Sequence, residues 1–290
     1  MSLNFKENQI SWDNKFIQAY CLNGEKDKYF YFSHANGFNG LTYQSLLQKI
    51  SSEFKVITYD MRGHGRTTLT ADPKKLNSWH RFRDDLIYLV ENLNSPAVLS
   101  GHSLGGTVSL LVALKKPTLV KKLILIDPVI LPLKYILAYK ILNLLNFQHF
   151  VSPLAKNALI RQNGWKNKEE AFEYFSNKKL FSKVSRKILN DYVEQSLVKN
   201  ENNKLNLRCN PEWESACFRL SSYEVWFGLK YINIPIKIVL TNNSRVCNKT
   251  AQRRIKKILP QTEIVFVKNT THMLPLEAAE EVSNEINNFL

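Results

Sequence analysis

Short apolar runs alternate with longer amphipathic stretches along most of this chain. The runs are rich in β-branched and aromatic residues and are bounded by turn residues, as strands are; they lie at 16–22, 29–33, 55–60, 97–101, 122–126, 236–240 and 263–267. Helical periodicity fills the stretches at 42–50, 78–93, 104–116, 249–258 and 277–289. Apolar strands joined by helical crossovers predict an α/β domain, with a mostly parallel sheet covered by helices on both faces.

One long region breaks this alternation. From Pro128 to about Tyr231 the pattern is helical, as in SPLAKNALIRQ and KEEAFEYFSN, and it contains no strand candidate. We therefore expect a helical cap inserted at 128–231, within an α/β core formed by 1–127 and 232–290.

The first candidate for chemistry is the pentapeptide GHSLG at 101–105. It follows the strand-like AVLSG and precedes the helical LGGTVSLLVALKK. A G-x-S-x-G sequence in this setting predicts a nucleophile elbow, in which Ser103 sits on a tight strand-to-helix turn with its hydroxyl at the edge of the sheet. A structural turn with an idle serine would give the same pattern and stays open as the alternative.

A serine nucleophile needs a base and donors for an oxyanion. His272 follows the last predicted strand, in the loop KNTTHMLPLE, and an imidazole can accept the serine proton near neutral pH. The first oxyanion donor we expect is the backbone amide of Leu104, at the start of the helix. The second lies in HANGFNG after the second predicted strand, where Gly37 lets Phe38 present its N–H. An unused surface histidine and an ordinary glycine turn are the alternatives.

Together these motifs resemble those of the α/β-hydrolases, in the serine-nucleophile branch with a helical cap that includes esterases and lipases. The matching segments run through the whole chain: HANGF (34–38), YDMRGHGRT (59–67), GHSLGG (101–106), LILIDP (123–128) and HMLPLE (272–277). The resemblance implies an eight-stranded sheet, an active site under the cap and no cofactor. It also gives the turn of Asp60, Arg62 and Gly63 a structural role beside the site.

The acid of a catalytic triad is missing from its usual place in this family. That place is the loop after the strand at 236–240, which reads TNNSRVCNKT and contains no aspartate or glutamate. Asp127, at the end of the strand at 122–126, is the substitute we favour, because some α/β-hydrolases place their acid there. Glu214 and Glu212, from NPEWESACF in the cap, are the alternative acids, and decayed catalytic machinery is a further alternative.

Composition and charge restrict the class of protein further. The N-terminus has no apolar run of signal-peptide length, and the four cysteines show no metal-binding spacing, so we expect free thiols, a cytoplasmic location and no metal site. The formal net charge of +15 is spread along the chain, and its densest cluster is RRIKK at 253–257. We interpret it as a solvated basic surface and expect no nucleic-acid partner, since only the net charge favours one.

The sequence thus predicts a serine hydrolase that cleaves an ester, a thioester or a related acyl compound through an acyl-enzyme intermediate. Its partner would be a small, apolar acyl substrate. Apolar residues of the predicted cap, together with the basic surface, leave peripheral contact with a membrane open. An acyltransferase and a ligand-binding protein that has lost its activity are the alternatives, and the sequence says nothing of the oligomeric state.

Overall fold

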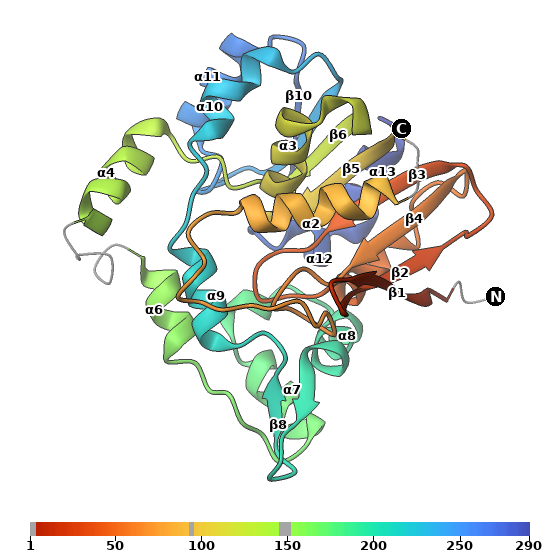
Figure 1. Ribbon diagram of the computed structural model, residues 1–290, viewed down its shortest axis with the longest axis vertical. Coiled ribbons are helices and arrows are strands. Elements are labelled where there is room, and N and C mark those ends of the chain that lie inside the picture. Colours follow the sequence, from red (N-terminus) through yellow and green to blue (C-terminus); the bar gives the residue numbers. More distant parts are fainter. Residues whose placement is uncertain (1–3, 93–95, 145–151) are drawn as a thin grey trace.

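The computed structural model describes residues 4–92, 96–144 and 152–290 (Figure 1). Eight strands form the main sheet: β1 (Lys6–Trp12), β2 (Lys15–Leu22), β3 (Lys28–Ser33), β4 (Phe54–Tyr59), β5 (Ala97–His102), β6 (Val120–Ile126), β9 (Ile236–Thr241) and β10 (Glu263–Val267). Their order is β1-β2-β4-β3-β5-β6-β9-β10. β1 pairs with β2 and β2 with β4 in antiparallel fashion, and the other pairs are parallel.

The order of the strands fixes where a site can form. The chain runs from β3 outward to β4 and returns to place β5 on the other side of β3, after which β6, β9 and β10 follow in turn. β3 and β5 are neighbours, but the chain leaves β3 towards β4 on one side and leaves β5 towards β6 on the other. The loops at their carboxyl ends therefore run in opposite directions and leave a crevice between them. Such a switch point is the usual ligand-binding crevice of open α/β sheets.

Helices cover both faces of this sheet, which confirms the α/β architecture predicted from the sequence (Figure 1). Alternate strand residues such as Tyr31 and Leu99 pack in one core cluster with α2 (His80–Glu91), α3 (Leu104–Lys115) and α11 (Lys249–Ile258). Their neighbours Phe30 and Val98 pack in a second cluster. The core helices that contribute to that cluster include α1 (Gln44–Leu47), α12 (Leu274–Glu277) and α13 (Ala279–Asn287), and helices of the region between β6 and β9 extend it. The short 3-10 helices of the core are η1 (Gly40–Tyr43) and η2 (Pro117–Leu119).

The edge strand β1 is absent from the sequence prediction, which began its first strand at residue 16. Its sequence, KENQISW, is polar and mostly exposed, so it lacks the apolar run on which the prediction depended. Asp13 and Asn14 join β1 to β2 with positive φ values of 47° and 59°. Two residues with positive φ form the hairpin turn whose twist matches paired strands, and Asn and Asp tolerate it.

The region between β6 and β9 is mostly helical. Its elements are α4 (Leu133–Leu144), α6 (Pro153–Leu159), α7 (Lys168–Ser176), η3 (Lys179–Phe181), α8 (Arg186–Ser196), α9 (Pro211–Phe218), α10 (Glu224–Gly228) and η4 (Leu229–Tyr231). It also contains a short antiparallel pair, β7 (Leu197–Lys199) and β8 (Leu205–Leu207), so the prediction that it lacks strands was wrong. Three residues per strand are too few for an alternating pattern to stand out. The division into core and cap at 128 and 231 stays a prediction.

No helix within the described ranges is both long enough and apolar enough to cross a membrane.

Candidate active site at the carboxyl edge of the sheet

Ser103 lies between the end of β5 and the start of α3. Its backbone has φ 56° and ψ −117°, a region that residues other than glycine rarely adopt. Holding a residue in such a conformation costs on the order of 1–3 kcal/mol, so the surrounding structure must enforce it. One restraint is the hydrogen bond from the Ser103 amide to the Ile126 carbonyl, at 3.0 Å.

The two glycines of the elbow are needed for close backbone approach. A Cβ on Gly101 would lie 2.5 Å from the carbonyl carbon of Gly105. A Cβ on Gly105 would lie 2.1 Å from the carbonyl oxygen of Ser33, at the end of β3. Both separations are far below van der Waals contact, so any larger residue would push α3 away from the sheet.

The structure brings Ser103, His272 and Asp127 together. The Ser103 Oγ lies 2.9 Å from His272 Nε2, and His272 Nδ1 lies 2.6 Å from Asp127 Oδ2. With the imidazole neutral, the serine hydroxyl donates to Nε2 and Nδ1–H donates to the carboxylate. Both Ser103 and Asp127 are buried, whereas the side chain of His272 is 34% exposed. This is the order of contacts that a nucleophile, a base and an orienting acid require.

Asp127 directly follows β6 and has a positive φ of 39°. Its amide donates to the Val239 carbonyl on β9 at 2.8 Å, which holds the residue at the edge of the sheet. The second carboxylate oxygen, Oδ1, is buried and has no hydrogen-bond partner within the described part of the chain. In the loop after β9, the Ser244 hydroxyl accepts a hydrogen bond from the Cys247 amide at 3.0 Å, so its contact is within that loop.

The two alternative acids take other positions. Glu214, on α9, forms an ion pair with Arg161, whose Nη1 lies 2.5 Å from Glu214 Oε2. Burial opposes the charge of Arg161, but Tyr192 and Glu214 outweigh it and raise the pKa of the guanidinium. Glu212 is exposed in the first turn of α9. The carboxylate that the structure places against His272 is therefore that of Asp127 rather than that of either glutamate.

The amides of the loop after β3 differ from the prediction. The Phe38 amide donates to the Ala35 carbonyl at 3.2 Å, closing a turn in which Gly37 has φ 79°, so it is not free to meet an oxyanion. The amides of Ala35 and Gly37 donate to Tyr43 and His64. The Asn36 amide has no hydrogen-bond partner among the described residues, and Asn36 lines the same cavity as Ser103 and Leu104. Asn36 therefore replaces Phe38 as the second candidate donor, beside Leu104.

A buried hydrogen-bond chain behind the site was not predicted from the sequence. The Ala35 amide donates to the Tyr43 hydroxyl, which lies 2.8 Å from His102 Nδ1, and His102 Nε2 lies 2.7 Å from the His272 carbonyl. A carbonyl can only accept, so Nε2 of His102 carries the proton and Nδ1 accepts from Tyr43. Burial, and then the neighbouring His272, lower the pKa of His102 well below its usual value, which keeps the imidazole neutral.

Two further buried histidines support the oxyanion loop. His34 Nε2 accepts from the Met61 amide at 2.9 Å, and His64 Nε2 accepts from the Gly37 amide at 3.1 Å. Burial lowers the pKa of His64 to about 4 and that of His34 well below its usual value. The signal for these roles was present in HANGF and YDMRGHGRT, but only the fold shows that the two segments contact each other.

A cavity of about 1000 Å³ opens above Ser103 and His272. Its walls come from α4, α6, α7, η3 and α9 and from the loop after β3, and most of its side chains are apolar or aromatic. Arg161, Lys178 and Lys179 are its basic members, and Glu214 is its acidic one. The volume lies at the upper end of the range for pockets that enclose small-molecule ligands.

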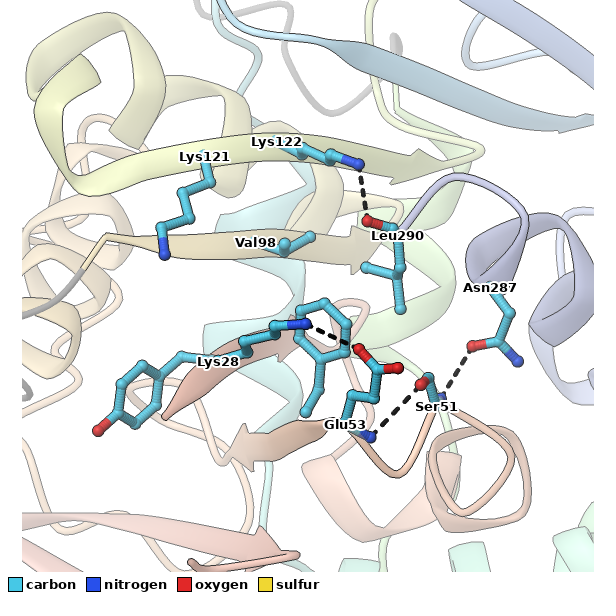
Figure 2. A pocket seen from close by; sticks show the side chains of 10 residues that line it. Lys28, Ser51, Glu53, Val98, Lys121, Lys122, Asn287 and Leu290 are labelled. Carbon is cyan, nitrogen blue, oxygen red and sulfur yellow. Dashed lines mark hydrogen bonds and ion pairs between the residues drawn. The ribbon is translucent and has the colours of Figure 1, made fainter. Parts of the chain in front are cut away.

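A second, smaller pocket of about 360 Å³ lies at the opposite end of the parallel strands (Figure 2). It is lined by residues at the amino ends of β3, β5 and β6, and most of its polar groups bind one another. Lys28 pairs with Glu53, and Lys122 donates to the Leu290 carbonyl. The pocket has no nucleophile beside a base, so the candidate site is the cavity at the carboxyl edge.

Comparison with known protein families identifies the family to which the chain belongs. The family described as serine aminopeptidase, S33 matches residues 25–279, which is most of the sequence. The chain belongs to the S33 family. Membership of this family confirms the resemblance to serine-nucleophile α/β-hydrolases, and the enzyme class that it indicates is hydrolase.

Individual relatives of this S33 member carry several hydrolase names. The 2-(acetamidomethylene)succinate hydrolase of Mesorhizobium japonicum is 34% identical over 97 residues, which cover 33% of this chain and 34% of that protein. A monoglyceride lipase homolog of Monkeypox virus is 27% identical over 176 residues, which cover 56% of this chain and 60% of that protein. Both matches thus span less than two thirds of the relative's length.

Solved structures share the fold over nearly the whole chain. That of E-2-(acetamidomethylene)succinate hydrolase has a TM-score of 0.78 at 19% identity and covers 99% of both chains. An esterase from Mycobacterium tuberculosis has a TM-score of 0.73 at 16% identity, with 98% of this chain and 90% of that one covered. At these identities the likeness concerns the fold alone, and it confirms the eight-stranded α/β-hydrolase architecture.

Proposed function

We propose that this S33 member is a serine hydrolase that cleaves an ester, a thioester or a related acyl compound through an acyl-enzyme intermediate. The observation that carries the proposal is the continuous hydrogen-bond chain from Ser103 through His272 to Asp127, at 2.9 Å and 2.6 Å, at the base of a largely apolar cavity. A solvated surface serine lacks both this base and this enclosure.

In the first half of the reaction, the Ser103 Oγ attacks the acyl carbonyl while His272 Nε2 takes its proton. Asp127 stabilises the imidazolium that forms and keeps its Nδ1–H oriented. The oxyanion of the tetrahedral intermediate accepts hydrogen bonds from the amides of Leu104 and Asn36. His272 then returns the proton to the leaving group, and the bond between that group and the acyl carbon breaks.

In the second half, a water molecule gives its proton to His272 Nε2 as its oxygen attacks the acyl-enzyme carbonyl. The same two amides bind the second oxyanion. Collapse of this intermediate breaks the bond to the Ser103 Oγ, the imidazolium returns a proton to that oxygen, and the carboxylic acid leaves. The net reaction consumes one water and requires no cofactor.

The cavity favours an apolar acyl group. Its walls are mostly aliphatic and aromatic, and its volume of about 1000 Å³ can enclose an extended hydrocarbon chain. Burying each additional methylene of such a chain contributes about 0.8 kcal/mol. We therefore expect kcat/KM to rise with acyl chain length until the cavity is filled.

The charges of the cavity disfavour an aminopeptidase reaction, which the name of the family would suggest. A peptide with a free N-terminus brings an ammonium group, which needs an unpaired acidic side chain nearby. The acid that lines the cavity, Glu214, is already paired with Arg161, and Lys178 and Lys179 add positive charge. An uncharged or anionic acyl compound fits these groups better.

A ligand-binding protein without activity is less well supported. The feature that favoured it was the missing acid after β9, and Asp127 supplies a carboxylate to His272 from β6 instead. Transfer of the acyl group to an acceptor other than water would use the same first half-reaction.

The test is hydrolysis of p-nitrophenyl esters of graded acyl length. We expect turnover by the wild-type protein with an optimum at an intermediate length, and loss of at least 10³-fold in Ser103→Ala. Ser100→Ala is the matched control, because Ser100 lies on β5, the strand that leads to Ser103, is fully buried and has a hydroxyl with no hydrogen-bond partner among the described residues. Equal rates for the Ser103→Ala and wild-type proteins would contradict the proposal.

A further inference from the structure

Exposed apolar side chains are concentrated on two helices beside the cavity. Of the eleven large hydrophobic side chains that are exposed among the described residues, six lie on α4 or on α6 and its C-cap. They are Tyr135 (53% exposed), Leu137 (50%), Ile141 (58%), Leu154 (57%), Leu159 (41%) and Ile160 (72%). Isolated exposed hydrophobic residues are normal on a protein surface, but a cluster of this size indicates a contact site.

The two helices face the same side of the molecule. In Figure 1, α4 and α6 both lie on the left of the structure, away from the main sheet. Tyr135 on α4 and Leu154 and Ile160 at α6 also line one and the same cavity. We call the exposed side chains of these two helices the α4/α6 face. It borders the cavity of the candidate active site.

Basic residues accompany the apolar ones on this face. On α4, Lys134, Leu137 and Ile141 are spaced i, i+3 and i+7, so they share one side of the helix. At α6, Lys156 precedes Leu159 and Ile160 by three and four residues and is exposed like them. Apolar side chains flanked by lysines on one helical side are typical of helices that lie in a membrane interface.

The sequence of this region is free of acidic residues. No aspartate or glutamate occurs from residue 128 to residue 168, whereas the same stretch contains Lys134, Lys140, Lys156, Arg161, Lys166 and Lys168. An anionic lipid surface attracts each nearby lysine by about 1 kcal/mol. Two copies of this chain that met through the α4/α6 face would instead bring their lysines together, which disfavours a dimer.

We propose that the α4/α6 face docks on an anionic lipid membrane. Leu137, Ile141 and Leu159 enter the boundary between headgroups and acyl chains, and Lys134 and Lys156 bind the lipid phosphates. Docking in this orientation places the cavity entrance against the membrane, so that an apolar compound passes from the lipid to the site without crossing water. The binding itself does not depend on the proposed hydrolysis, because none of these five residues lines the cavity.

The test is co-flotation of the full chain with lipid vesicles. We expect binding to vesicles of phosphatidylcholine and phosphatidylglycerol, weaker binding to pure phosphatidylcholine, and a decrease with salt. Lys134→Ala and Lys156→Ala should each weaken binding about 5-fold, the equivalent of about 1 kcal/mol. The double variant Leu137→Glu/Ile141→Glu should abolish binding while the protein stays folded, since both side chains are already exposed.

Two matched controls separate this face from the rest of the basic surface. Tyr231→Glu replaces a side chain that is 70% exposed outside the α4/α6 face, and Arg253→Ala/Lys257→Ala removes two charges from the cluster on α11. Both should bind vesicles like the wild-type protein. Absence of vesicle binding, equal binding by the Leu137→Glu/Ile141→Glu and Tyr231→Glu proteins, or loss of binding in the α11 variant would overturn the proposal. So would self-association through this face without vesicle binding.

Discussion

Asp127 is held by the sheet rather than by a long loop. It directly follows β6, donates its amide to Val239 on β9 and points its carboxylate at His272. β5, which ends at the elbow, is the strand that pairs with β6 on its other side. The acid and the nucleophile thus come from adjacent strands of one sheet, which fixes their separation without any contribution from the loop after β9.

Asp127→Asn should reduce kcat/KM for esters on the order of 10⁴-fold. The amide NH₂ of asparagine would donate to His272 Nδ1, which leaves the proton on Nε2, where it cannot accept the hydrogen of Ser103. The measurement is steady-state kinetics on the folded variant. Glu212→Gln is the control, because this glutamate is exposed on α9 and should be dispensable. A rate for Asp127→Asn within 10-fold of wild type would contradict the assignment.

At the scale of single residues, the sequence was sufficient to select Ser103 and His272 as candidates, because each follows a strand within a specific motif. It favoured Asp127 because the residue ends a strand on which some α/β-hydrolases place their acid, but nothing in LILIDP shows which way a carboxylate points. It selected Phe38, whose amide closes a turn in the structure, because a choice among the amides of HANGF depends on which of them a turn uses. That choice is a property of backbone hydrogen bonds, which sequence patterns do not reveal.

The elbow between β5 and α3 is the element on which the position of Ser103 depends. α3 begins directly at the nucleophile and is buried along nearly its whole length. Its first turn contacts the backbone at the end of β3 through Gly105. This close approach therefore fixes the position of the nucleophile relative to β3, the strand that leads into the oxyanion loop.

Gly105→Ala should destabilise the protein by about 3 kcal/mol or more, because the new methyl group would overlap the Ser33 carbonyl. Gly164→Ala is the matched control, since a Cβ there meets no atom within 4 Å, and it should be neutral or slightly stabilising. Urea unfolding of the three proteins measures the difference. An unfolding midpoint for Gly105→Ala equal to that of Gly164→Ala would contradict the close approach.

Element prediction succeeded where a strand contains an apolar run and failed where it does not. The seven strands predicted from apolar runs all occur in the main sheet; six of them are mostly buried, and the edge strand β10 keeps its apolar run although most of its residues are exposed or half-buried. β1 was missed because an exposed edge strand can be polar, as KENQISW is. β7 and β8 were missed because their pairing joins a short segment after α8 to another before α9, and each is only three residues long.

At the scale of the whole molecule, polar contacts join the region between β6 and β9 to the loops of the sheet edge. The Asn36 side-chain amide donates to the Glu214 carbonyl at 3.0 Å, and Trp213 Nε1 donates to the Arg62 carbonyl at 3.0 Å. Arg62 in turn forms a buried ion pair with Asp85 on α2. The cavity walls are thus fixed to the same loops that form the candidate oxyanion site.

Three buried neutral histidines should make the fold sensitive to mild acid. An unfolded histidine titrates near pH 6.5, whereas burial lowers the pKa of His64 to about 4 and lowers those of His34 and His102. Between these values the unfolded chain binds more protons, so stability is complete above about pH 6.5 and decreases as the pH falls. His64 alone accounts for a loss of about 3 kcal/mol by pH 4.

Urea unfolding at several pH values between 7 and 5 measures this dependence. The free energy of unfolding should change little between pH 7 and 6.5 and, below about pH 6, decrease by up to about 1.4 kcal/mol per pH unit for each buried histidine; His64→Gln should remove one such contribution. His80→Gln is the control, because His80 lies at the start of α2 and is partly exposed. A free energy of unfolding that is constant over this range would show that the histidines are not buried in neutral form.

The most direct measurement of the central claim is intact-mass spectrometry after treatment with a fluorophosphonate. The hydrogen-bond chain from Ser103 to His272 and Asp127 predicts addition of one phosphonyl group per chain, located on Ser103 by peptide mapping and absent from Ser103→Ala. The Ser100→Ala protein should react like the wild-type protein. An unmodified mass for the folded wild-type protein, or a modification that persists in Ser103→Ala, would contradict the assignment of Ser103 as an activated nucleophile.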